Sequence, residues 1–425
     1  MGGVSMEWKE VRLGDVCEIK HGFAYKGKYF SDTPTCDILV TPGNFTLSGG
    51  FKLDKPKFYN GPVEKDYILS KGDLIVTMTD LSKNIDTLGY SALVPEVKGL
   101  TFHHNQRIGL VENIANNVDK YFLYWIMRTP AYQSFIATHS SGTTVHHTSP
   151  KGIGNYIFKL PPLDDQRRIA SILSSLDRKI ELNNKINAGL EEMAQAIFKN
   201  WFVDFEPFKD GKFVDSELGM IPEGWKVGKI TDIGCLITDY VSNGSFASLK
   251  QNVHLYETKE YAQFIRNTDL KTNTFSVYVD KHSYDFLSKS TLYGNEIIIS
   301  NVGDVGSVHL CPKLDIPMTL GNNIIMLRPN EKEYNYFLYL WFKYFSGQGL
   351  IQGIKGGSAQ PKFNKTDFKN LPLLIPSFEI IERSYWIFES MFSILSSNVK
   401  ENSRLSLLRD TLLPRLMSGE IEIPE

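Results

Sequence analysis

The chain has 425 residues, of which 42% are hydrophobic and 22% are charged, and its formal net charge is −2. This composition is typical of a globular protein with more than one domain, and the near-neutral charge argues against an indiscriminate nucleic-acid binder. The sequence contains no long apolar run and begins without an apolar signal core, so we expect a cytoplasmic protein that does not contact membrane. The cysteines show no C-x-x-C pair or metal-ligand spacing, and we expect them to be reduced.

The sequence repeats itself with a period of about 215 residues, and a repeat of this length decides the architecture before any local pattern does. Trp8-Lys9 opens the first copy and Trp225-Lys226 opens the second. The run Tyr-Phe-Leu-Tyr at residues 121–124 returns at residues 336–339. We therefore predict two similar globular units and not an enzyme with a single pocket.

In chain order, each copy begins with short β-branched runs bounded by turn residues. Leu74-Ile75-Val76 follows a Lys-Gly-Asp turn in the first copy, and Ile297-Ile298-Ile299 follows a Gly-Asn-Glu turn in the second. Such runs predict strands. A helix is expected near residues 121–127 and again near 336–345, so each globular unit should mix α and β structure.

A long amphipathic helix is predicted after each unit. Pro161 and Pro162 end the first sheet, and Asp164 and Asp165 suit a helix N-terminus. Apolar residues then recur in steps of four and three, which predicts a supercoiled pair of helices, each about 40 residues or about 60 Å long. The seam positions are Ile169, Leu173, Leu176, Ile180, Asn183, Asn187, Leu190, Ala194, Ile197 and Trp201 in the first helix, and Phe388, Met391, Leu395, Asn398, Asn402, Leu405, Leu412 and Leu416 in the second.

We expect the two helices to be antiparallel, because the second unit begins where the first helix ends and finishes where the second helix begins. This pairing sets Asn183 and Asn187 against Asn398 and Asn402. Polar residues in a seam fix its register at some cost in stability. The alternative is that these four asparagines face solvent.

The predicted fold class is α+β, with two mixed α/β units separated by two long antiparallel helices and related by a pseudo-twofold repeat. The predicted boundaries are 1–162 for the first unit, 163–206 for the first helix, 207–376 for a linker and the second unit, and 377–425 for the second helix and the C-terminal tail.

Three runs in the first helical region and one near the C-terminus resemble a known family. Residues 160–170 (LPPLDDQRRIA), 180–187 (IELNNKIN) and 196–205 (AIFKNWFVDF) look like the first conserved region of the DNA-specificity subunit of type I restriction-modification systems. Residues 408–421 (LRDTLLPRLMSGEI) are similar to the C-terminal signature of that family. The resemblance covers essentially the whole chain, although the strand-rich units match in layout alone.

The resemblance implies that each unit is a target recognition domain that reads one half of a bipartite, asymmetric site in double-stranded DNA. The helices would set the spacer between the halves and dock two modification (adenine methyltransferase) subunits. Restriction subunits would join them to form an ATP-driven endonuclease. The chain itself would be non-catalytic and without a cofactor, with S-adenosylmethionine, ATP and Mg expected in the partner subunits.

The sequence motifs agree with a non-catalytic chain. Pro161-Pro162 is followed by Leu and does not make the polar-Pro-Pro-aromatic motif of an adenine methyltransferase. Gly27-Lys28 and Gly211-Lys212 are followed by Tyr and Phe, so neither is a phosphate-binding loop. Residues 303–306 (GDVG) are interpreted as a turn and not as a cofactor loop.

Two adjacent histidine pairs, His103-His104 and His146-His147, could suggest a metal site. Neighbouring residues of a strand point to opposite faces, so one ion rarely binds both. Polar loop positions or DNA contacts are the favoured interpretation for both pairs.

Polar, glycine-rich loops with local positive charge supply the candidates for DNA contact. Hydroxyl groups, amides and lysines suit phosphate oxygens, whereas Gln, Asn, His and Arg side chains can reach base edges. The alternatives are solvated connecting loops and turn caps. The candidates are Lys26 and Lys28; Asn105, Gln106 and Arg107; Ser141, Thr143, Thr144, His146, His147 and Lys151; Asn322 and Asn323; and Lys355, Ser358, Gln360 and Lys362, with residues 79–84 and Asn301 as weaker ones.

Two other functions compete with the DNA-specificity subunit. A coiled-coil scaffold that separates two interaction domains would explain the helices without DNA. A self-sufficient restriction enzyme is opposed by the missing catalytic motifs.

Overall fold

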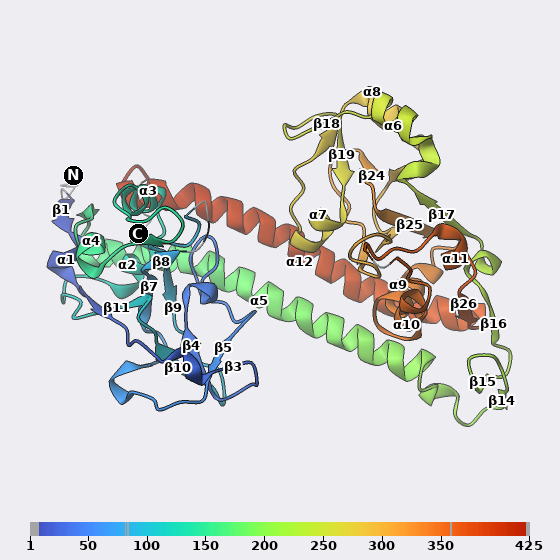
Figure 1. Ribbon diagram of the computed structural model, residues 1–425, viewed down its shortest axis with the longest axis horizontal. Helices are drawn as coiled ribbons and strands as arrows, with labels where there is room; N and C mark the ends of the chain where they lie inside the picture. The colour runs from blue at the N-terminus through green and yellow to red at the C-terminus, as the bar shows by residue number, and fades with distance from the viewer. Residues whose placement is uncertain (1–7, 81, 83–84, 358, 422–425) are drawn as a thin grey trace, which may run out of the picture. The chain divides into compact units, whose positions relative to one another are not determined.

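The computed structural model describes residues 8–80, 82, 85–357 and 359–421 (Figure 1). The chain divides into two compact units, the first formed by residues 1–182 with 401–425 and the second by residues 183–400. The two longest helices, α5 (Leu163–Phe202) and α12 (Phe378–Ser418), each contribute one segment to either unit. Both units combine sheets with helices, which confirms the predicted mixed α/β class.

The first unit contains two main sheets. The four-stranded sheet has the order β2 (Glu18–His21), β11 (Ile108–Glu112), β7 (Leu74–Thr77), β9 (Ser91–Leu93). The five-stranded sheet has the order β3 (Phe30–Ser31), β5 (Lys57–Tyr59), β4 (Asp37–Val40), β10 (Thr101–His104), β6 (Ile68–Leu69), with β4 and β10 parallel. Two short pairs, β1 (Lys9–Arg12) with β13 (Ile157–Leu160) and β8 (Thr79–Asp80) with β12 (His146–His147), and the helices α1 (Leu13–Val16), α2 (Lys120–Ile126), α3 (Pro130–Thr138) and α4 (Pro150–Gly154) complete it.

The second unit repeats the strand order of both main sheets. Its four-stranded sheet has the order β17 (Cys235–Asp239), β25 (Ile324–Pro329), β22 (Ile297–Ser300), β23 (Val308–Leu310). Its five-stranded sheet has the order β18 (Leu255–Tyr256), β20 (Tyr278–Val279), β19 (Ala262–Ile265), β24 (Met318–Leu320), β21 (Thr291–Leu292), and again the third and fourth strands are parallel. Strand β16 (Lys226–Lys229) pairs with β26 (Pro372–Ile375), as β1 does with β13. The predicted repeat is therefore structural.

The helices of the second unit follow the same plan with additions. Helices α9 (Tyr334–Tyr344), α10 (Ser346–Gly353) and α11 (Lys365–Lys369) stand where the first unit has α2, α3 and α4. Three further helices, α6 (Phe246–Asn252), α7 (Asn267–Thr272) and α8 (Lys281–Phe286), lie between strands of the five-stranded sheet or just before it. A hairpin of β14 (Phe213–Val214) and β15 (Ile221–Pro222) precedes the sheets.

Segments of α5 and α12 complete the core of each unit. In the first, Leu173 of α5 and Leu416 of α12 are buried with Phe122 and Trp125 of α2. Burying one large apolar side chain contributes about 1.5–3 kcal/mol, so the apolar stripe of each helix segment is a large part of the stability of its unit. The second unit has the same construction, with Phe198, Phe202, Phe388 and Phe392 packed around Phe337 and Trp341 of α9.

The predicted seam is confirmed within each unit. Every seam position predicted in α5 is buried or half-buried. Two pairs in the first unit show that the helix segments are antiparallel, because Asp177 contacts Arg409 at 2.7 Å and the later Lys179 contacts the earlier Glu401 at 3.2 Å.

Three of the four seam asparagines, Asn183, Asn187 and Asn398, belong to the second unit. Asn398 Nδ2 donates a hydrogen bond of 2.9 Å to Asn187 Oδ1, and Asn183 is fully buried. These positions contradict the solvent-facing alternative for Asn183 and agree with a register role for Asn187 and Asn398. Asn402, which belongs to the first unit, is half-buried.

The first long helix ends four residues before the predicted boundary at residue 206. Phe205 has a left-handed backbone conformation, with φ of 55°, and Pro207 follows it. A non-glycine residue in this conformation and a proline each stop an α-helix, because the first reverses the backbone twist and the second removes an N–H donor. Residues 206–208 instead form a short 3₁₀ turn.

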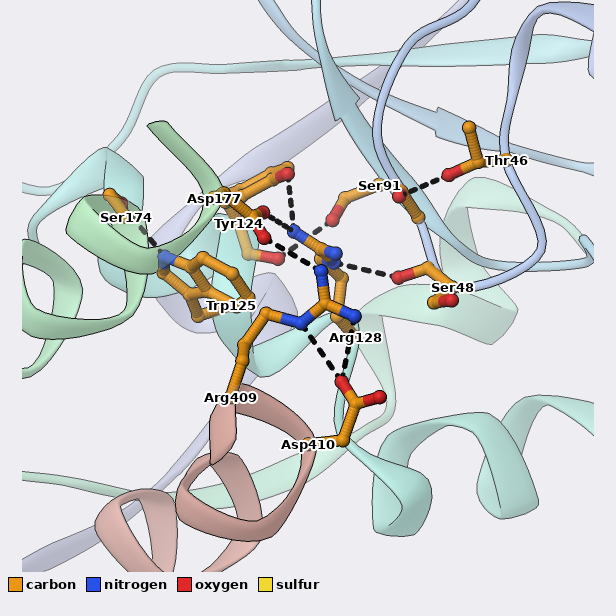
Figure 2. Close-up of polar contacts among 11 residues, drawn as sticks. Thr46, Ser48, Ser91, Tyr124, Trp125, Arg128, Ser174, Asp177, Arg409 and Asp410 are labelled. Atoms are coloured by element: carbon orange, nitrogen blue, oxygen red, sulfur yellow. Dashed lines mark hydrogen bonds and ion pairs between the residues drawn. The ribbon is translucent and has the colours of Figure 1, made fainter. Parts of the chain in front are cut away.

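A network of charged side chains joins the turn after α2 of the first unit to the segments of α5 and α12 in the same unit (Figure 2). Arg128, whose side chain is 3% exposed, contacts Asp177 of α5 at 2.9 Å. It also donates to the carbonyl of Ser48 at 2.7 Å, and its guanidinium lies over the Trp125 ring at 4.3 Å. Asp177 accepts a second hydrogen bond from Arg409 of α12, which in turn contacts Asp410 at 2.8 Å. The two arginines and two aspartates thus balance in charge.

We expect Asp177→Asn to destabilise the protein by about 3 kcal/mol, because it leaves Arg128 and Arg409 without the carboxylate that they share. Chemical unfolding followed by tryptophan fluorescence and circular dichroism measures the loss. Asp410→Asn is the matched control, since Asp410 lies at the exposed end of the network and its loss should cost less than about 1 kcal/mol. Equal effects of the two substitutions would contradict the central role of Asp177.

Candidate nucleic-acid interface

The loop between α3 and α4 of the first unit is a tight hairpin. Ser141 and His147 exchange two backbone hydrogen bonds of 2.9 and 2.8 Å, which close it. Gly142 has φ of 100°, and a Cβ atom there would lie 2.0 Å from the carbonyl oxygen of Val145. Glycine is therefore required at this position.

The second unit has an equivalent hairpin. Gly356 and Lys362 exchange two backbone hydrogen bonds of 2.9 Å. Gly357 has φ of 88°, and a Cβ atom there would lie 2.5 Å from the carbonyl oxygen of Gln360. The two loops that the repeat sets in register therefore share one backbone design.

Each hairpin is attached to the chain that follows a central strand of the four-stranded sheet. In the first unit, Thr148 N donates to the carbonyl of Met78 at 3.0 Å, and Thr79 Oγ1 lies 3.1 Å from His147 Nδ1. In the second unit, Phe363 N donates to the carbonyl of Asn301 at 3.0 Å. Met78 and Asn301 thus occupy equivalent places.

Met78 and Asn301 also bind the turns that carry the candidates Arg107 and Asn323. Met78 N donates to the carbonyl of Arg107 at 2.9 Å, and Asn301 N donates to the carbonyl of Asn323 at 3.1 Å. Arg107 lies in the turn between β10 and β11, and Asn323 lies in the corresponding turn between β24 and β25. Hairpin and turn therefore meet at one site in each unit, an adjacency that the sequence did not show.

The lysine-containing loop of the first unit begins at the same place. Gln106 N donates to the carbonyl of Phe23 at 2.9 Å, and Phe23 N donates to the carbonyl of His104 at the same distance. Tyr25 is buried against Tyr59, with ring centroids 5.0 Å apart, so it anchors the loop while Lys26 and Lys28 are exposed.

Most of the candidate side chains are exposed. The exposed ones are Lys26, Lys28, Gln106, Arg107, Ser141, Thr143, Thr144, His147, Lys151, Asn322, Asn323, Lys355, Gln360 and Lys362. Asn105 departs from the prediction because it is buried and its Oδ1 accepts from Arg107 N at 3.1 Å, so its amide caps the turn. His146 is half-buried, and Ser358 lies outside the described residues.

The weaker candidates at residues 79–84 are partly structural. Asp80 is buried, and its carboxylate accepts backbone hydrogen bonds from Ser82 at 2.6 Å and Leu88 at 3.0 Å. Burial alone would raise the pKa of Asp80, but hydrogen bonds from Ser82 and Thr87 outweigh it and lower the pKa. Asp80 therefore anchors the loop that follows it; residues 81, 83 and 84 lie outside the described residues.

The interpretation of His103 and His104 as loop residues or DNA contacts is wrong. Both lie in β10 and are fully buried. His103 Nε2 lies 2.6 Å from Asp37 Oδ1, and His104 Nε2 lies 2.7 Å from the carbonyl of Ile108. Burial lowers the pKa of His104 to about 4, so this ring is neutral near pH 7.

Within the described residues, neither a cluster of metal-ligating side chains nor a helix able to cross a membrane is found.

The second unit has a hollow of about 400 Å³ beside its candidate turn. Sequence reasoning missed most of its lining; the available signal was an isolated Phe in the polar run Ser-Asn-Gly-Ser-Phe. On one side Lys365 Nζ contacts Asp239 Oδ1 at 2.8 Å and Ser242 Oγ at 2.6 Å, which fixes the chain there. The lining residues are Asp239, Tyr240, Val241, Phe246, Leu249, Lys250, Asn301, Val302, Asn322, Asn323 and Ile324.

Comparison with known proteins agrees with the presence of two similar units in the chain. The family model described as "Type I restriction modification DNA specificity domain" matches residues 6–192 and 222–405. The chain belongs to this family of specificity subunits.

Two similar proteins are specificity subunits of type I restriction enzymes that match nearly the whole of this chain. The type I restriction enzyme HindI specificity subunit of Haemophilus influenzae is 27% identical and covers 98% of this chain and 100% of its own. The EcoBI specificity subunit of Escherichia coli is 22% identical, and the match covers 97% of this chain and 86% of the EcoBI subunit. The fold is similar to the crystal structure of the type I restriction-modification S subunit from M. genitalium, with a TM-score of 0.60, 16% identity and 98% coverage of both chains.

We expect Gly142→Ala to open the first hairpin, because the new Cβ would collide with the Val145 carbonyl in addition to the strain of a positive φ. Hydrogen exchange of the amides of Ser141 and His147 should accelerate by about ten-fold or more, since the loss of about 1.4 kcal/mol corresponds to ten-fold.

Gly99→Ala is the control for this change. Gly99 also has a positive φ, of 81°, but its Cβ would meet nothing within 4 Å. Unchanged exchange at Ser141 and His147 in Gly142→Ala would show that the hairpin does not depend on this glycine.

Proposed function

We propose that each unit reads one half of a bipartite, asymmetric target in double-stranded DNA. The observation that carries the proposal is the recurrence of one backbone site, made of a glycine hairpin and a strand-connecting turn, in both units. Exposed polar side chains project from this site in each unit, whereas the cores beneath it are apolar.

The side chains divide by chemistry. Lys151 and Lys362 suit phosphate oxygens, which position a protein on DNA without reading its sequence. Gln360, Asn323 and Arg107 can form paired hydrogen bonds with base edges in the major groove.

Equivalent positions of the two sites carry different residues. His147 of the first hairpin corresponds to Lys362 of the second, and Arg107 of the first turn corresponds to Asn323 of the second. A shared backbone with different reading groups favours two different half-sites, and hence an asymmetric target.

In this proposal α5 and α12 set the spacing of the half-sites and dock two modification (methyltransferase) subunits, to which restriction subunits add. The exposed apolar side chains of these helices favour a docking role, because such groups tend to lie at interfaces. They include Leu182, Met193, Trp386, Ile394 and Leu407. Catalysis would belong to the partners, with S-adenosylmethionine, ATP and Mg bound there, and this chain would be non-catalytic.

The first test is modular exchange. The chain is produced with methyltransferase subunits of its system, and the methylated sites of the modified DNA are sequenced. We expect a bipartite site, and we expect replacement of residues 8–160 by the corresponding unit of a relative to change one half alone. Simultaneous change of both halves would contradict separate reading, and methylation without sequence preference would favour a mere scaffold.

A second test separates positioning from reading. Lys151→Ala and Lys362→Ala should each weaken binding to every DNA sequence and reduce the slope of log affinity against log salt by about 1. Gln360→Ala should instead relax preference at one base pair, with a loss of about 1–3 kcal/mol of discrimination. Gel-shift titrations with cognate and singly altered duplexes measure both effects. Because all three side chains are exposed, folding should not change. Uniform weakening by Gln360→Ala would remove its reading role.

A further inference from the structure

The second unit presents apolar side chains to solvent beside its candidate DNA-reading turn. Phe246, the first residue of α6, is 81% exposed, and Val241 is 43% exposed. Both line the same hollow as Asn322 and Asn323. Because both residues line one hollow, they form an apolar patch and not scattered exposed groups, and such a patch favours contact with another molecule.

The segment that carries these apolar groups is firmly held. Ser242 N donates to Asp239 Oδ1 at 2.9 Å, and Lys365 neutralises the Asp239 carboxylate. Leu249, one turn after Phe246, is 2% exposed and packs in the core of the five-stranded sheet. Phe246 and Val241 are thus presented from a fixed backbone.

The polar part of the lining combines three amides with Tyr240, Lys250 and Asp239, whose carboxylate is paired with Lys365. Asn322 and Asn323 are exposed in the turn, and the buried Oδ1 of Asn301 has no hydrogen-bond partner in the described part of the chain. Lys250, also exposed, adds a positive charge at the same hollow. Amides and a lysine beside an apolar wall suit a nucleic acid better than an apolar protein surface.

One base pair shows both kinds of partner on its major-groove edge. Adenine presents an acceptor and a donor that a side-chain amide can bind together, and the thymine opposite presents an apolar methyl group. We propose that the second unit reads an A·T pair in its half-site, with Asn322 and Asn323 toward the adenine and with Phe246 and Val241 against the thymine 5-methyl group. This inference rests on the proposed function, because it names the base pair that the same site reads.

The test uses the chain assembled with its methyltransferase subunits and a target whose half-sites have been assigned by modular exchange. Each thymine of the half-site read by the second unit is replaced in turn by uracil, which lacks the methyl group and keeps the same hydrogen bonds. We expect affinity to fall about four-fold at one position, the effect of removing one buried methyl group.

Phe246→Ala should lower affinity for the thymine target and abolish the difference between thymine and uracil at that position. Leu255→Ala is the matched control, because Leu255 is 56% exposed in the same unit but does not line the hollow. It should keep the four-fold difference.

Two DNA-binding results would overturn the inference: equal affinity for all uracil-substituted targets, or a thymine–uracil difference that survives Phe246→Ala. Loss of assembly with the methyltransferase subunits in Phe246→Ala would assign the patch to a protein contact and also overturn it. Failure of the parent complex to bind any specific duplex would instead refute the proposed function itself.

Discussion

Neither unit has a complete core without both long helices. The core around α2 of the first unit includes Leu173 of α5 and Leu416 of α12, and these two residues lie far apart in the sequence. A contact between residues so far apart costs chain entropy before it gives any stabilisation. The constraint explains why the seam continues without interruption along α5, because its early part serves one core and its later part serves the other.

The two units attach the segments of α5 and α12 to their cores through different side-chain interactions, although their backbone topology is similar. The first joins the turn after α2 to its helix segments through Arg128, Asp177 and Arg409. In the second, the residue aligned with Asp177 is Phe392, which stacks on Tyr336 with centroids 5.0 Å apart. Aromatic packing depends little on exact charge placement, whereas a buried ion network tolerates only its own partners. The charged junction of the first unit should therefore tolerate fewer substitutions than the aromatic junction of the second unit.

Whether a feature of the fold could be predicted from the sequence depends on how far apart in the chain its interacting residues lie. The repeat, the mixed class and the seam came from the sequence, because a helix buries residues at a period that the sequence itself displays. The correspondence of the two hairpins came from the repeat spacing. The parallel pairing of β4 with β10 did not, since strand order depends on contacts between distant segments.

The errors at the site have the same origin. His103 and His104 looked like a polar pair, but parallel pairing on one side and an antiparallel strand on the other buried them in mid-sheet. Asn105 looked like a reading group, but the turn uses its amide internally. The surface formed by Phe246 had no periodic signal, because α6 has no counterpart in the first unit.

The glycine hairpins have an evolutionary consequence. Their shape depends on backbone hydrogen bonds and on Gly142 and Gly357, so the remaining loop positions are free to vary. Exchanges at exposed positions usually change stability by no more than about 0.5 kcal/mol. Under the proposed function, new recognition can therefore arise by drift without passing through unfolded intermediates. If each unit reads its own half-site, as proposed, a lineage with several variants of each unit gains as many specificities as there are pairings of the two units.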